Sequence, residues 1–505
     1  MMAEHSVIRL PTLAILLEDI VDVKPSVDMP VAAVRLDSRL VELSDLFIAH
    51  EGTQTSGTRF IHDAIAKGAS AILVDAKSGI AEASVPIPVY SVSNLSAKTG
   101  LIASRFYDNP SKDLYVSGIT GTNGKTSIAY YLAQALSESG TQPVGSIGTL
   151  GYGVFPDLQA SANTTPDAIT IQRLLSEFRS RRIRDVVMEV SSHALEQGRA
   201  NNILFHTAVF SNLSRDHLDY HGDMSRYAGA KRKLLLSDGL ANAVINFDDE
   251  FGQQLIKDLT GQLNVISYGL ADSVRRTNAP RPFIEAVIKK QEFNSLLMGI
   301  NSPWGSGELQ ARLTGRFNAY NLLAALGVLY LRGMTFDSAV HKLSSVQAVP
   351  GRMEFFGRPD TARIFVDYSH TPDALQQALK SLREQCSGRL LCVFGCGGDR
   401  DQGKRPEMGR IAETGADHVI LTSDNPRSEK PEKIIEDILD GMTGSTSIEI
   451  QPDRALAIRA AITGSGKEDI VLIAGKGHET YQEIMATKLP FSDRQLVRSL
   501  LEQSR

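Results

Sequence analysis

The chain has 505 residues, 42% hydrophobic and 22% charged, with 53 basic residues against 58 acidic ones. This length corresponds to about three domains, and the balance of apolar and charged residues excludes long disorder. The formal charge of −5 argues against a nucleic-acid binder, and no apolar run reaches the roughly 20 residues that span a bilayer.

Cysteine usage and the N-terminus both indicate a cytoplasmic protein. The three cysteines, Cys386, Cys392 and Cys396, are too few and odd in number for a disulfide framework. We predict buried free thiols around the apolar string at 390–396 rather than a zinc site, since no histidine lies at ligand spacing. The short N-terminal apolar patch contains Pro11 and has acidic flanks, which is not typical of a signal peptide.

Three α/β domains are predicted in chain order, and no internal repeat is evident. Residues 1–112 form a small α/β domain with a helical pattern at 59–67 and a linker at 106–114. Residues 113–347 form a doubly wound parallel-sheet P-loop domain, and residues 348–505 a Rossmann-like α/β domain. The predicted strands lie at 31–38, 45–50, 70–75, 87–92, 114–120, 185–190, 207–214, 242–249, 363–368, 390–395, 417–423 and 469–475.

A phosphate-binding loop is predicted at 118–127, where the run GITGTNGKTS follows a strand and opens a helix. Backbone N–H groups of such a loop cradle phosphates, Lys125 would reach the terminal phosphates, and the Thr126 hydroxyl would hold Mg²⁺. The strict pattern fails because Gly118 lies one residue too far upstream, and a glycine-rich turn with an incidental lysine is the alternative. No guanine-binding motif is evident, which disfavours a GTPase.

Two further groups of polar residues follow predicted strands. Glu189 lies near the carboxyl end of the strand at 185–190, where ligands of open α/β sheets gather and a carboxylate suits Mg²⁺. Asp216, His217, Asp219 and His221 cluster in the loop after the next strand. By itself this cluster is more typical of a hydrogen-bonded loop than of a metal site.

The order of the motifs resembles the Mur ligase family, in particular the branch that synthesises UDP-N-acetylmuramoyl-tripeptide. The matching segments between about 115 and 485 are GTNGKTS, MEVSSHAL, FSNLSRDHLDYHG, YAGAKRKLL, LTGRFNAYNLLAAL, GRMEFF, VDYSHTPDAL, FGCGGDRDQGKRPEMG, DNPR and AGKGHETYQE. The N-terminal match is weaker and rests on LDSR and GTQTSGTRFI.

The resemblance implies an ATP- and Mg²⁺-dependent amide ligase of peptidoglycan precursor synthesis, which activates a carboxylate as an acyl phosphate before an amine displaces phosphate. The implied catalytic residues are Lys125, Glu189, His217 and Lys231. Thr126, Glu189, His217 and Lys231 form the implied metal site, with Lys231 carbamylated so that a cation becomes an anionic oxygen ligand. From residue type alone, an exposed helix lysine is the alternative, and Lys233 competes for the role.

The resemblance also assigns the nucleotide and sugar-peptide sites. The implied ATP-binding residues are Gly121, Thr122, Asn123, Gly124, Lys125, Thr126, Ser127, Asn318, Asn321, Arg352 and Asp367. An asparagine at a helix start is otherwise usually a cap. The implied residues for UDP-N-acetylmuramoyl-L-alanyl-D-glutamate are Leu36, Ser38, Thr53, Gln54, Thr55, Asn163, Thr164, Thr165, Ser191, Gln197 and Arg199. The run NTTPD at 163–167 is also an ordinary turn and cap signature.

The run Asp424-Asn425-Pro426-Arg427 implies that the added amino acid is meso-2,6-diaminopimelate, although these residues also suit a strand-to-helix turn. Arg427 can bind the second carboxylate, which lysine lacks, while Asp424 or Asn425 takes the neighbouring ammonium. The implied pocket comprises Arg400, Asp424, Asn425, Pro426, Arg427, Gly475 and Glu479.

Four alternatives stay open at this point: a lysine-adding enzyme, another Mur ligase such as the dipeptide-adding one, folylpolyglutamate synthetase, and a P-loop ATPase or nucleotide-binding regulator without ligase activity. An amine-independent ATPase rate would favour the last of these. We expect no nucleic-acid or membrane partner and take a monomer as the default.

Overall fold

The computed structural model describes residues 10–52, 55–80, 85–137, 142–271 and 282–503. They form two compact units. One unit contains the N-terminal sheet and strands β6–β9. The other contains the phosphate loop, strands β11–β15 and the whole C-terminal sheet. Among the described residues, none of the helices combines the length and apolar character that crossing a bilayer requires.

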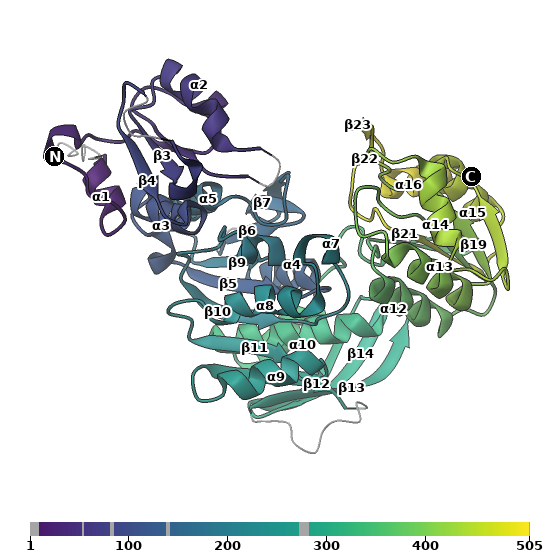
Figure 1. The fold of residues 1–505 in the computed structure, drawn as a ribbon. Coiled ribbons are helices and arrows are strands. Elements are labelled where there is room, and N and C mark those ends of the chain that lie inside the picture. Colours follow the sequence, from purple (N-terminus) through teal and green to yellow (C-terminus); the bar gives the residue numbers. More distant parts are fainter. Residues whose placement is uncertain (1–9, 53–54, 81–84, 138–141, 272–281, 504–505) are drawn as a thin grey trace. The chain divides into compact units, whose positions relative to one another are not determined.

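The N-terminal sheet is parallel, with its strands in sequence order (Figure 1). One face packs against α1 (Leu13–Leu17) and α3 (Leu95–Phe106), and the other against α2 (Ile61–Ala66). Its strands are β1 (Val34–Arg35), β2 (Leu46–Ala49), β3 (Ala71–Asp75) and β4 (Val89–Val92), with short 3₁₀ turns at Pro25–Val27, Ser38–Leu40, Gly57–Phe60, Ala76–Ser78 and Pro110–Asp113. Alternate strand residues face opposite helical layers, as the period of a strand requires.

The central sheet has the strand order β15-β14-β13-β12-β11-β10-β5-β9-β6-β7-β8. Its strands are β5 (Tyr115–Thr120), β6 (Val144–Gly148), β7 (Gly151–Val154), β8 (Asp157–Gln159), β9 (Asp185–Glu189), β10 (Phe205–Phe210), β11 (Asn242–Asn246), β12 (Asn264–Leu270), β13 (Phe283–Glu292), β14 (Ser295–Ser302) and β15 (Gly305–Ala311). Strands β10–β13 are parallel to one another, which confirms the predicted parallel interior. At both edges of the sheet, short turns join neighbouring strands into antiparallel hairpins. The sequence interpretation missed these hairpins.

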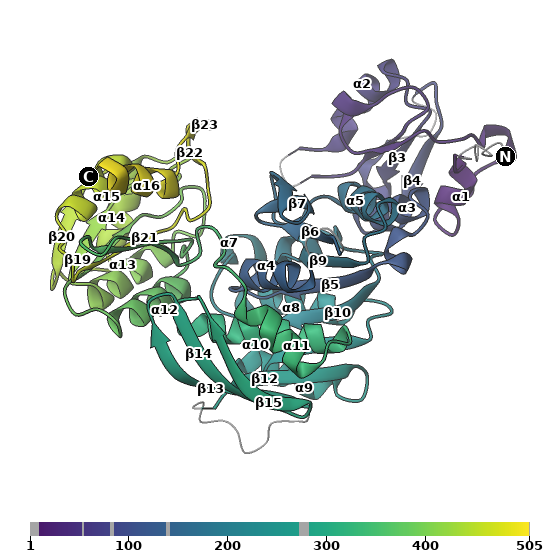
Figure 2. The ribbon, with the colours of Figure 1, turned by 180° about the vertical axis from the view of Figure 1, so that it is seen from behind.

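The helices of this region include one that is buried along most of its length. Helix α10 (Arg316–Leu331) packs against α4, α11 and strands β11–β13 (Figures 1 and 2), and a helix buried on every face is expected to lack a polar stripe. The other helices are α4 (Lys125–Leu136), α5 (Ala168–Ser180), α6 (Ser192–Glu196), α7 (Leu218–His221), α8 (Met224–Leu235), α9 (Glu250–Leu259) and α11 (Phe336–Ser344).

The C-terminal sheet has the order β16-β17-β21-β18-β19-β20 and is parallel except for β16. Its strands are β16 (Glu354–Phe356), β17 (Arg363–Asp367), β18 (Leu390–Phe394), β19 (His418–Leu421), β20 (Ser447–Ile450) and β21 (Ile470–Ala474), and a separate hairpin comprises β22 (Tyr481–Ile484) and β23 (Thr487–Pro490). One face carries α12 (Pro372–Arg383), α13 (Lys404–Gly415) and α14 (Pro431–Leu439), and the other α15 (Arg454–Thr463) and α16 (Asp493–Gln503). Helices on both faces confirm the doubly wound prediction.

The cysteine prediction is also confirmed. All three cysteines are free thiols, and Cys392 and Cys396 are buried in the layer between β18 and α13. Burial raises the pKa of Cys392 to about 12 and that of Cys396 to about 11, so both thiols stay protonated at neutral pH.

Candidate active site

The phosphate loop joins β5 to α4, and two of its glycines are required by sterics. Gly121 and Gly124 have positive φ angles of 146° and 87°. A Cβ on Gly121 would lie 1.9 Å from Ser211 Oγ, and one on Gly124 would lie 2.5 Å from Asn321 Oδ1. Gly118, by contrast, lies inside β5, where a Cβ would meet the ring of Phe205 at 2.8 Å. The strict motif fails because Gly118 is a packing residue and the loop begins at Gly121.

The residues that follow β10 hold this loop in place. Asn212 Oδ1 accepts a hydrogen bond of 2.9 Å from the backbone N–H of Asn123, and Ser211 Oγ donates one of 2.6 Å to the Asn123 carbonyl. Lys125 Nζ donates to the carbonyls of Gly121 and Thr122, each at 2.8 Å. The lysine ammonium therefore lies against the loop that would surround a phosphate.

Lys231 on α8 is the buried lysine of this region, and Lys233 is not. Lys231 is 1% exposed, and its Nζ donates to the Gly121 carbonyl at 2.7 Å and lies 4.2 Å from the centre of the Tyr227 ring. Burial, and then the charge of Lys125, lowers the pKa of Lys231 well below its usual range. The side chain of Lys233 is 47% exposed and pairs with Glu196 at 2.6 Å. The structure thus separates the two lysines that the motif left in competition.

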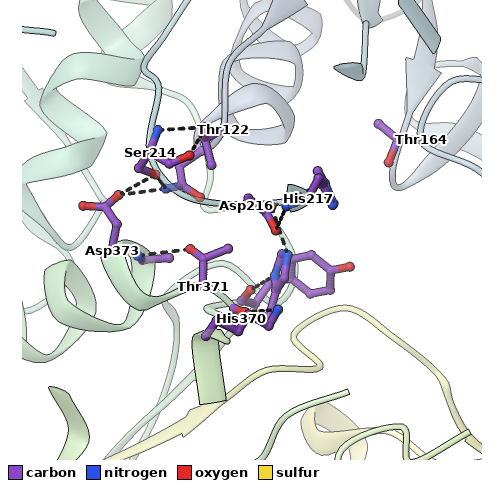
Figure 3. Close-up of polar contacts among 12 residues, drawn as sticks. Thr122, Thr164, Ser214, Asp216, His217, His370, Thr371 and Asp373 are labelled. Atoms are coloured by element: carbon purple, nitrogen blue, oxygen red, sulfur yellow. Dashed lines mark hydrogen bonds and ion pairs between the residues drawn. The ribbon is translucent and has the colours of Figure 1, made fainter. Parts of the chain in front are cut away.

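Asp216 lies between two histidines (Figure 3). Its Oδ2 is 3.3 Å from His217 Nε2 and 4.0 Å from His370 Nε2, and its Oδ1 accepts from the backbone N–H of His217. Burial opposes the ionised form, but the charges of His217, His370, Lys404 and Lys125 outweigh it and lower the pKa of Asp216 to about 2. Asp216 is therefore a carboxylate at neutral pH. Within the predicted loop cluster, Asp216 contacts His217. Asp219 does not take part in the Asp216–His217 contact.

Glu189 ends β9 and is bound to Thr149, which the sequence interpretation did not single out. Glu189 Oε1 accepts from the Thr149 backbone N–H at 2.8 Å, and Oε2 accepts from the Thr149 hydroxyl at 3.0 Å. The hydroxyls of Thr149 and Thr164 are 3.1 Å apart. Thr149 follows β6, and its place after a strand is the signal that could have identified it.

Several of the predicted sugar-peptide residues meet around this strand end. Thr165 Oγ1 donates to the Glu189 carbonyl at 2.8 Å and accepts from the Ser191 backbone N–H at 3.0 Å. Arg199 donates to the Thr165 carbonyl, and Ser191 Oγ caps α6. Leu36 and Ser38 lie by the N-terminal sheet, Thr55 and Asn163 are exposed, the Gln197 carbonyl accepts from Ser96, and Thr53 and Gln54 lie outside the described residues.

A cavity of about 390 Å³ adjoins the phosphate loop, and six of the predicted nucleotide residues line it: Asn123, Gly124, Ser127, Asn321, Arg352 and Asp367. Arg352 Nε is buried there and has no hydrogen-bond partner among the described residues. Arg352 Nη2 donates to Thr126 Oγ1 at 3.3 Å, and its guanidinium lies 4.2 Å from the centre of the Tyr368 ring. An unsatisfied guanidinium N–H beside a phosphate loop fits a nucleotide phosphate.

The two predicted asparagines of α10 have different surroundings. Neither caps the helix, because the N-cap is Gly315. Asn318 binds the Thr314 carbonyl at 2.8 Å and the Tyr131 hydroxyl at 2.9 Å, and it is not among the residues lining the cavity. Asn321 lines the cavity and donates to Asn318 Oδ1 at 3.1 Å. We therefore expect Asn318 to act through Asn321.

A residue of the C-terminal region also contacts the phosphate loop. Asp373, in the first turn of α12, accepts from Asn123 Nδ2 at 2.9 Å and from Ser214 Oγ at 3.4 Å (Figure 3). His370 lies near Asp216, and burial together with the charge of Lys404 lowers the pKa of His370 to about 4. The sequence interpretation missed the contacts of His370 and Asp373, although both belong to the quoted motif VDYSHTPDAL.

The predicted amino-acid residues gather at the carboxyl ends of β18, β19 and β21. A Cβ on Gly475 would lie 2.4 Å from Asp424 Oδ2, and one on Gly397 would lie 2.9 Å from Arg427 Nη1 and 3.7 Å from Arg400 Cγ. Glycines at these positions let the backbone approach the charged side chains. The structure therefore brings Arg400 and the loop Asp424–Arg427 to one edge of the sheet.

A fully buried lysine, which the sequence interpretation missed, organises this edge. Lys476 Nζ donates to Glu479 Oε2 at 2.7 Å and to Asn425 Oδ1 at 2.9 Å, and Asn425 Nδ2 donates to Glu479 Oε2 at 2.9 Å. Lys476 is 0% exposed. Glu479 Oε2 therefore accepts two hydrogen bonds, one from Lys476 and one from Asn425.

The described residues contain no group of three or more histidine, cysteine, aspartate or glutamate side chains arranged to hold a metal ion. A site that uses a threonine hydroxyl, one carboxylate, a histidine and a modified lysine together with phosphate oxygens would not form such a group. Thr126, Glu189, His217 and Lys231 therefore stay a predicted metal site.

Three family models match the chain in order: the Mur ligase family catalytic domain over residues 30–107, the Mur ligase middle domain over 119–329, and the glutamate ligase domain of Mur ligases over 351–477. Curated proteins named UDP-N-acetylmuramoyl-L-alanyl-D-glutamate–2,6-diaminopimelate ligase are similar along most of their length. The protein from Coxiella burnetii is 46% identical over 92% of this chain and 94% of its own. That from Pseudomonas aeruginosa is 43% identical over 92% and 94%.

Solved structures agree with this assignment. A structure of a 2,6-diaminopimelate ligase of the same name aligns with a TM-score of 0.68 and 35% identity, covering 98% of this chain and 99% of the other. MurF from Acinetobacter baumannii (TM-score 0.66, 18% identity, 98% and 100% covered) and folylpolyglutamate synthase from Mycobacterium tuberculosis (0.58, 17%, 76% and 92%) share the fold. With the fold, the phosphate loop and the full-length relatives in agreement, the chain belongs to the Mur ligase family.

Proposed function

We propose that this protein is an ATP- and Mg²⁺-dependent ligase that joins an amine of meso-2,6-diaminopimelate to the D-glutamate γ-carboxylate of UDP-N-acetylmuramoyl-L-alanyl-D-glutamate. The observation that carries the proposal is the loop Asp424–Arg427, which presents an arginine beside acidic side chains in a chain whose relatives bear this ligase name. The arginine suits the distal carboxylate, and Asp424 or Glu479 suits the ammonium beside it.

ATP would supply the phosphoryl group that activates the carboxylate. The cavity beside the phosphate loop would hold it, with Gly121–Ser127 around the phosphates, Asn321 and Asp367 on the nucleoside side, and Arg352 at a phosphate. Asp367 already accepts from the Met353 backbone N–H at 2.6 Å and from the Ser369 hydroxyl, so a ribose hydroxyl would be an additional donor. Thr126, Glu189, His217 and Lys231 would hold Mg²⁺, which neutralises phosphate charge.

The surroundings of Lys231 support its modification. Burial lowers the pKa of Lys231 and so favours its neutral amine form, which is the form that can attack carbon dioxide. The C–N bond forms, one C=O π pair moves onto oxygen, and a proton from nitrogen leaves to solvent. The product is a carbamate, whose oxygens suit Mg²⁺ where an ammonium would repel it.

For the sugar-peptide, we propose the residues around the end of β9, with Thr164, Thr165, Ser191 and Arg199 nearest to the activated carboxylate. Arg199 suits an anionic group of that substrate. Asn163 and Gln197, and Leu36, Ser38, Thr53, Gln54 and Thr55 of the N-terminal region, complete the proposed site. We place the domain limits near residues 112 and 347.

The test is the mass of the nucleotide product after incubation with ATP, Mg²⁺, the dipeptide precursor and diaminopimelate, alongside a phosphate-release assay. We expect one diaminopimelate added per phosphate released, and no turnover when Mg²⁺ is chelated. Equal rates with lysine would remove the specificity proposal, and phosphate release without an amine would favour a simple ATPase. Dependence on folate in place of the UDP-sugar would indicate a folylpolyglutamate synthetase.

A further inference from the structure

The loop that carries Arg427 is attached to the hairpin β22–β23 by backbone hydrogen bonds. The Arg427 N–H donates to the Glu483 carbonyl at 3.1 Å, and the Arg427 carbonyl accepts from the Met485 N–H at 2.8 Å. The Glu483 N–H donates to Asn425 Oδ1 at 2.9 Å, and Gln482 Nε2 donates to the Asp424 carbonyl at 2.8 Å. The hairpin therefore acts as a template for the loop, although more than fifty residues separate them.

Arg427 depends on this attachment because its own backbone is strained. Its φ is 52°, in the left-handed region, which a residue with a long side chain adopts only when its surroundings hold it there. The bonds to Glu483 and Met485 fix this conformation from both sides of the peptide. The direction in which the Arg427 side chain leaves the backbone is therefore set by the hairpin.

The guanidinium itself is held at two points. Arg427 Nη1 donates to the Gly398 carbonyl at 2.7 Å, and Nε lies 3.4 Å from Glu483 Oε2. The two side chains are 22% and 25% exposed. Nη2 has no contact of this kind among the described residues, so the two restraints leave part of the planar fork available to a carboxylate.

We propose that Glu483 is a positioning residue for amino-acid specificity, which orients the Arg427 guanidinium toward the distal carboxylate of the incoming amino acid. This inference rests on the proposed function. Glu483 acts through Arg427 and need not touch the substrate. An arginine that is already oriented loses less side-chain entropy when it binds, which is the advantage of preorganisation.

The side chain of Glu483 can be changed without detaching the hairpin, because the four hydrogen bonds described above use the Glu483 backbone or another residue. Glu483→Ala removes the carboxylate at Nε. Glu483→Gln keeps an oxygen that can accept from Nε–H but removes the charge. Glu449→Ala is a matched control, because Glu449 on β20 of the neighbouring six-stranded sheet is also a strand glutamate in an ion pair, with His418 at 3.6 Å.

The experiment measures kcat and KM for diaminopimelate, KM for ATP, and the rate with lysine for each full-length variant. For Glu483→Ala we expect KM for diaminopimelate to rise about five-fold, the size of one partly exposed ion pair, with kcat and KM for ATP unchanged. Glu483→Gln should recover most of the change, and Glu449→Ala should match wild type. In an Arg427→Ala background, Glu483→Ala should have no further effect, because its target is gone.

The outcomes separate this inference from the function on which it depends. If wild type adds diaminopimelate and Glu483→Ala leaves KM and the preference over lysine unchanged, only the role of Glu483 is overturned. An effect of Glu483→Ala that persists in the Arg427→Ala background would also overturn it, because Glu483 would then act elsewhere. If wild type makes no diaminopimelate product, the proposed function and this inference fall together.

Discussion

The nucleotide side and the amino-acid side of the molecule each bury one lysine completely, and the two lysines have opposite surroundings. Lys231 donates to a carbonyl, lies against the ring of Tyr227 and is repelled by Lys125. Lys476 donates to the carboxylate of Glu479 and to Asn425. Among the residues that the structure describes, no carboxylate forms a hydrogen bond with Lys231 to compensate its charge, whereas Lys476 forms a buried ion pair.

This difference indicates what each lysine is for. An uncompensated buried amine holds its proton less tightly, and its neutral form is a nucleophile, which suits the proposed modification. A compensated buried ammonium fixes its partners, which suits a residue that prepares a pocket. Burial alone therefore does not predict the role of a lysine. The presence or absence of a carboxylate partner distinguishes the two lysines.

The largest effect is expected from Lys231→Met, which keeps the volume of the side chain but cannot form a carbamate. We expect kcat to fall at least about a hundred-fold, because a proposed metal ligand is lost. The same substitution at the exposed Lys233, on the same helix, should leave kcat near wild type. Intact mass of the wild-type protein in bicarbonate should show the added mass of one carbon dioxide. Activity that survives in Lys231→Met would contradict the reactive role of this lysine.

Arg427→Lys tests the amino-acid side. A lysine cannot make the bidentate contact with the distal carboxylate, so KM for diaminopimelate should rise roughly ten- to a hundred-fold while KM for ATP stays constant. Steady-state kinetics with each substrate varied in turn would measure this. A variant that behaves as wild type would mean that the loop Asp424–Arg427 does not select the amino acid.

Lys476→Met examines the compensated lysine. Removing one partner leaves Glu479, whose side chain is 16% exposed, without its counter-ion, and the free energy of unfolding in urea should fall by about 3 kcal/mol. Lys476→Met combined with Glu479→Gln should recover part of that loss. Lys433→Met removes a surface pair with Asp437, 60% exposed at the lysine, and should cost less than about 0.5 kcal/mol. Equal losses at both positions would show that burial does not distinguish them.

The smallest effect concerns pH. Burial and the charges of Arg352 and Arg494 lower the pKa of His478 to about 3, and burial and Lys404 lower that of His370 to about 4. Below the ordinary histidine pKa of 6.5, these two histidines take up protons in the unfolded chain but stay neutral in the folded protein. The free energy of unfolding should therefore be unaffected by these histidines above pH 6.5 and should decline as the pH falls toward 4. Chemical denaturation of His478→Gln and His370→Gln across this range should show a shallower decline, and unchanged slopes would argue that neither histidine is held neutral.

Contiguous features were predictable from the sequence. The phosphate loop, the strands that precede Thr126, Glu189 and Arg427, and the doubly wound C-terminal region follow from local pattern, because backbone conformation and apolar periodicity are written in neighbouring residues. The antiparallel edges of the central sheet were missed. Their alternating burial, seen along β14, was present in the sequence but was not interpreted as hairpins.

The sequence by itself thus determined the family, the sheets and the candidate residues near each strand end. Only the tertiary structure decided that Lys231 is buried and Lys233 exposed, that Thr149 binds Glu189, that Lys476 pairs with Glu479, and that Glu483 lies beside Arg427. The reason is physical: the protonation and orientation of a side chain depend on burial and on charges brought close by packing. Residues far apart along the chain provide those charges.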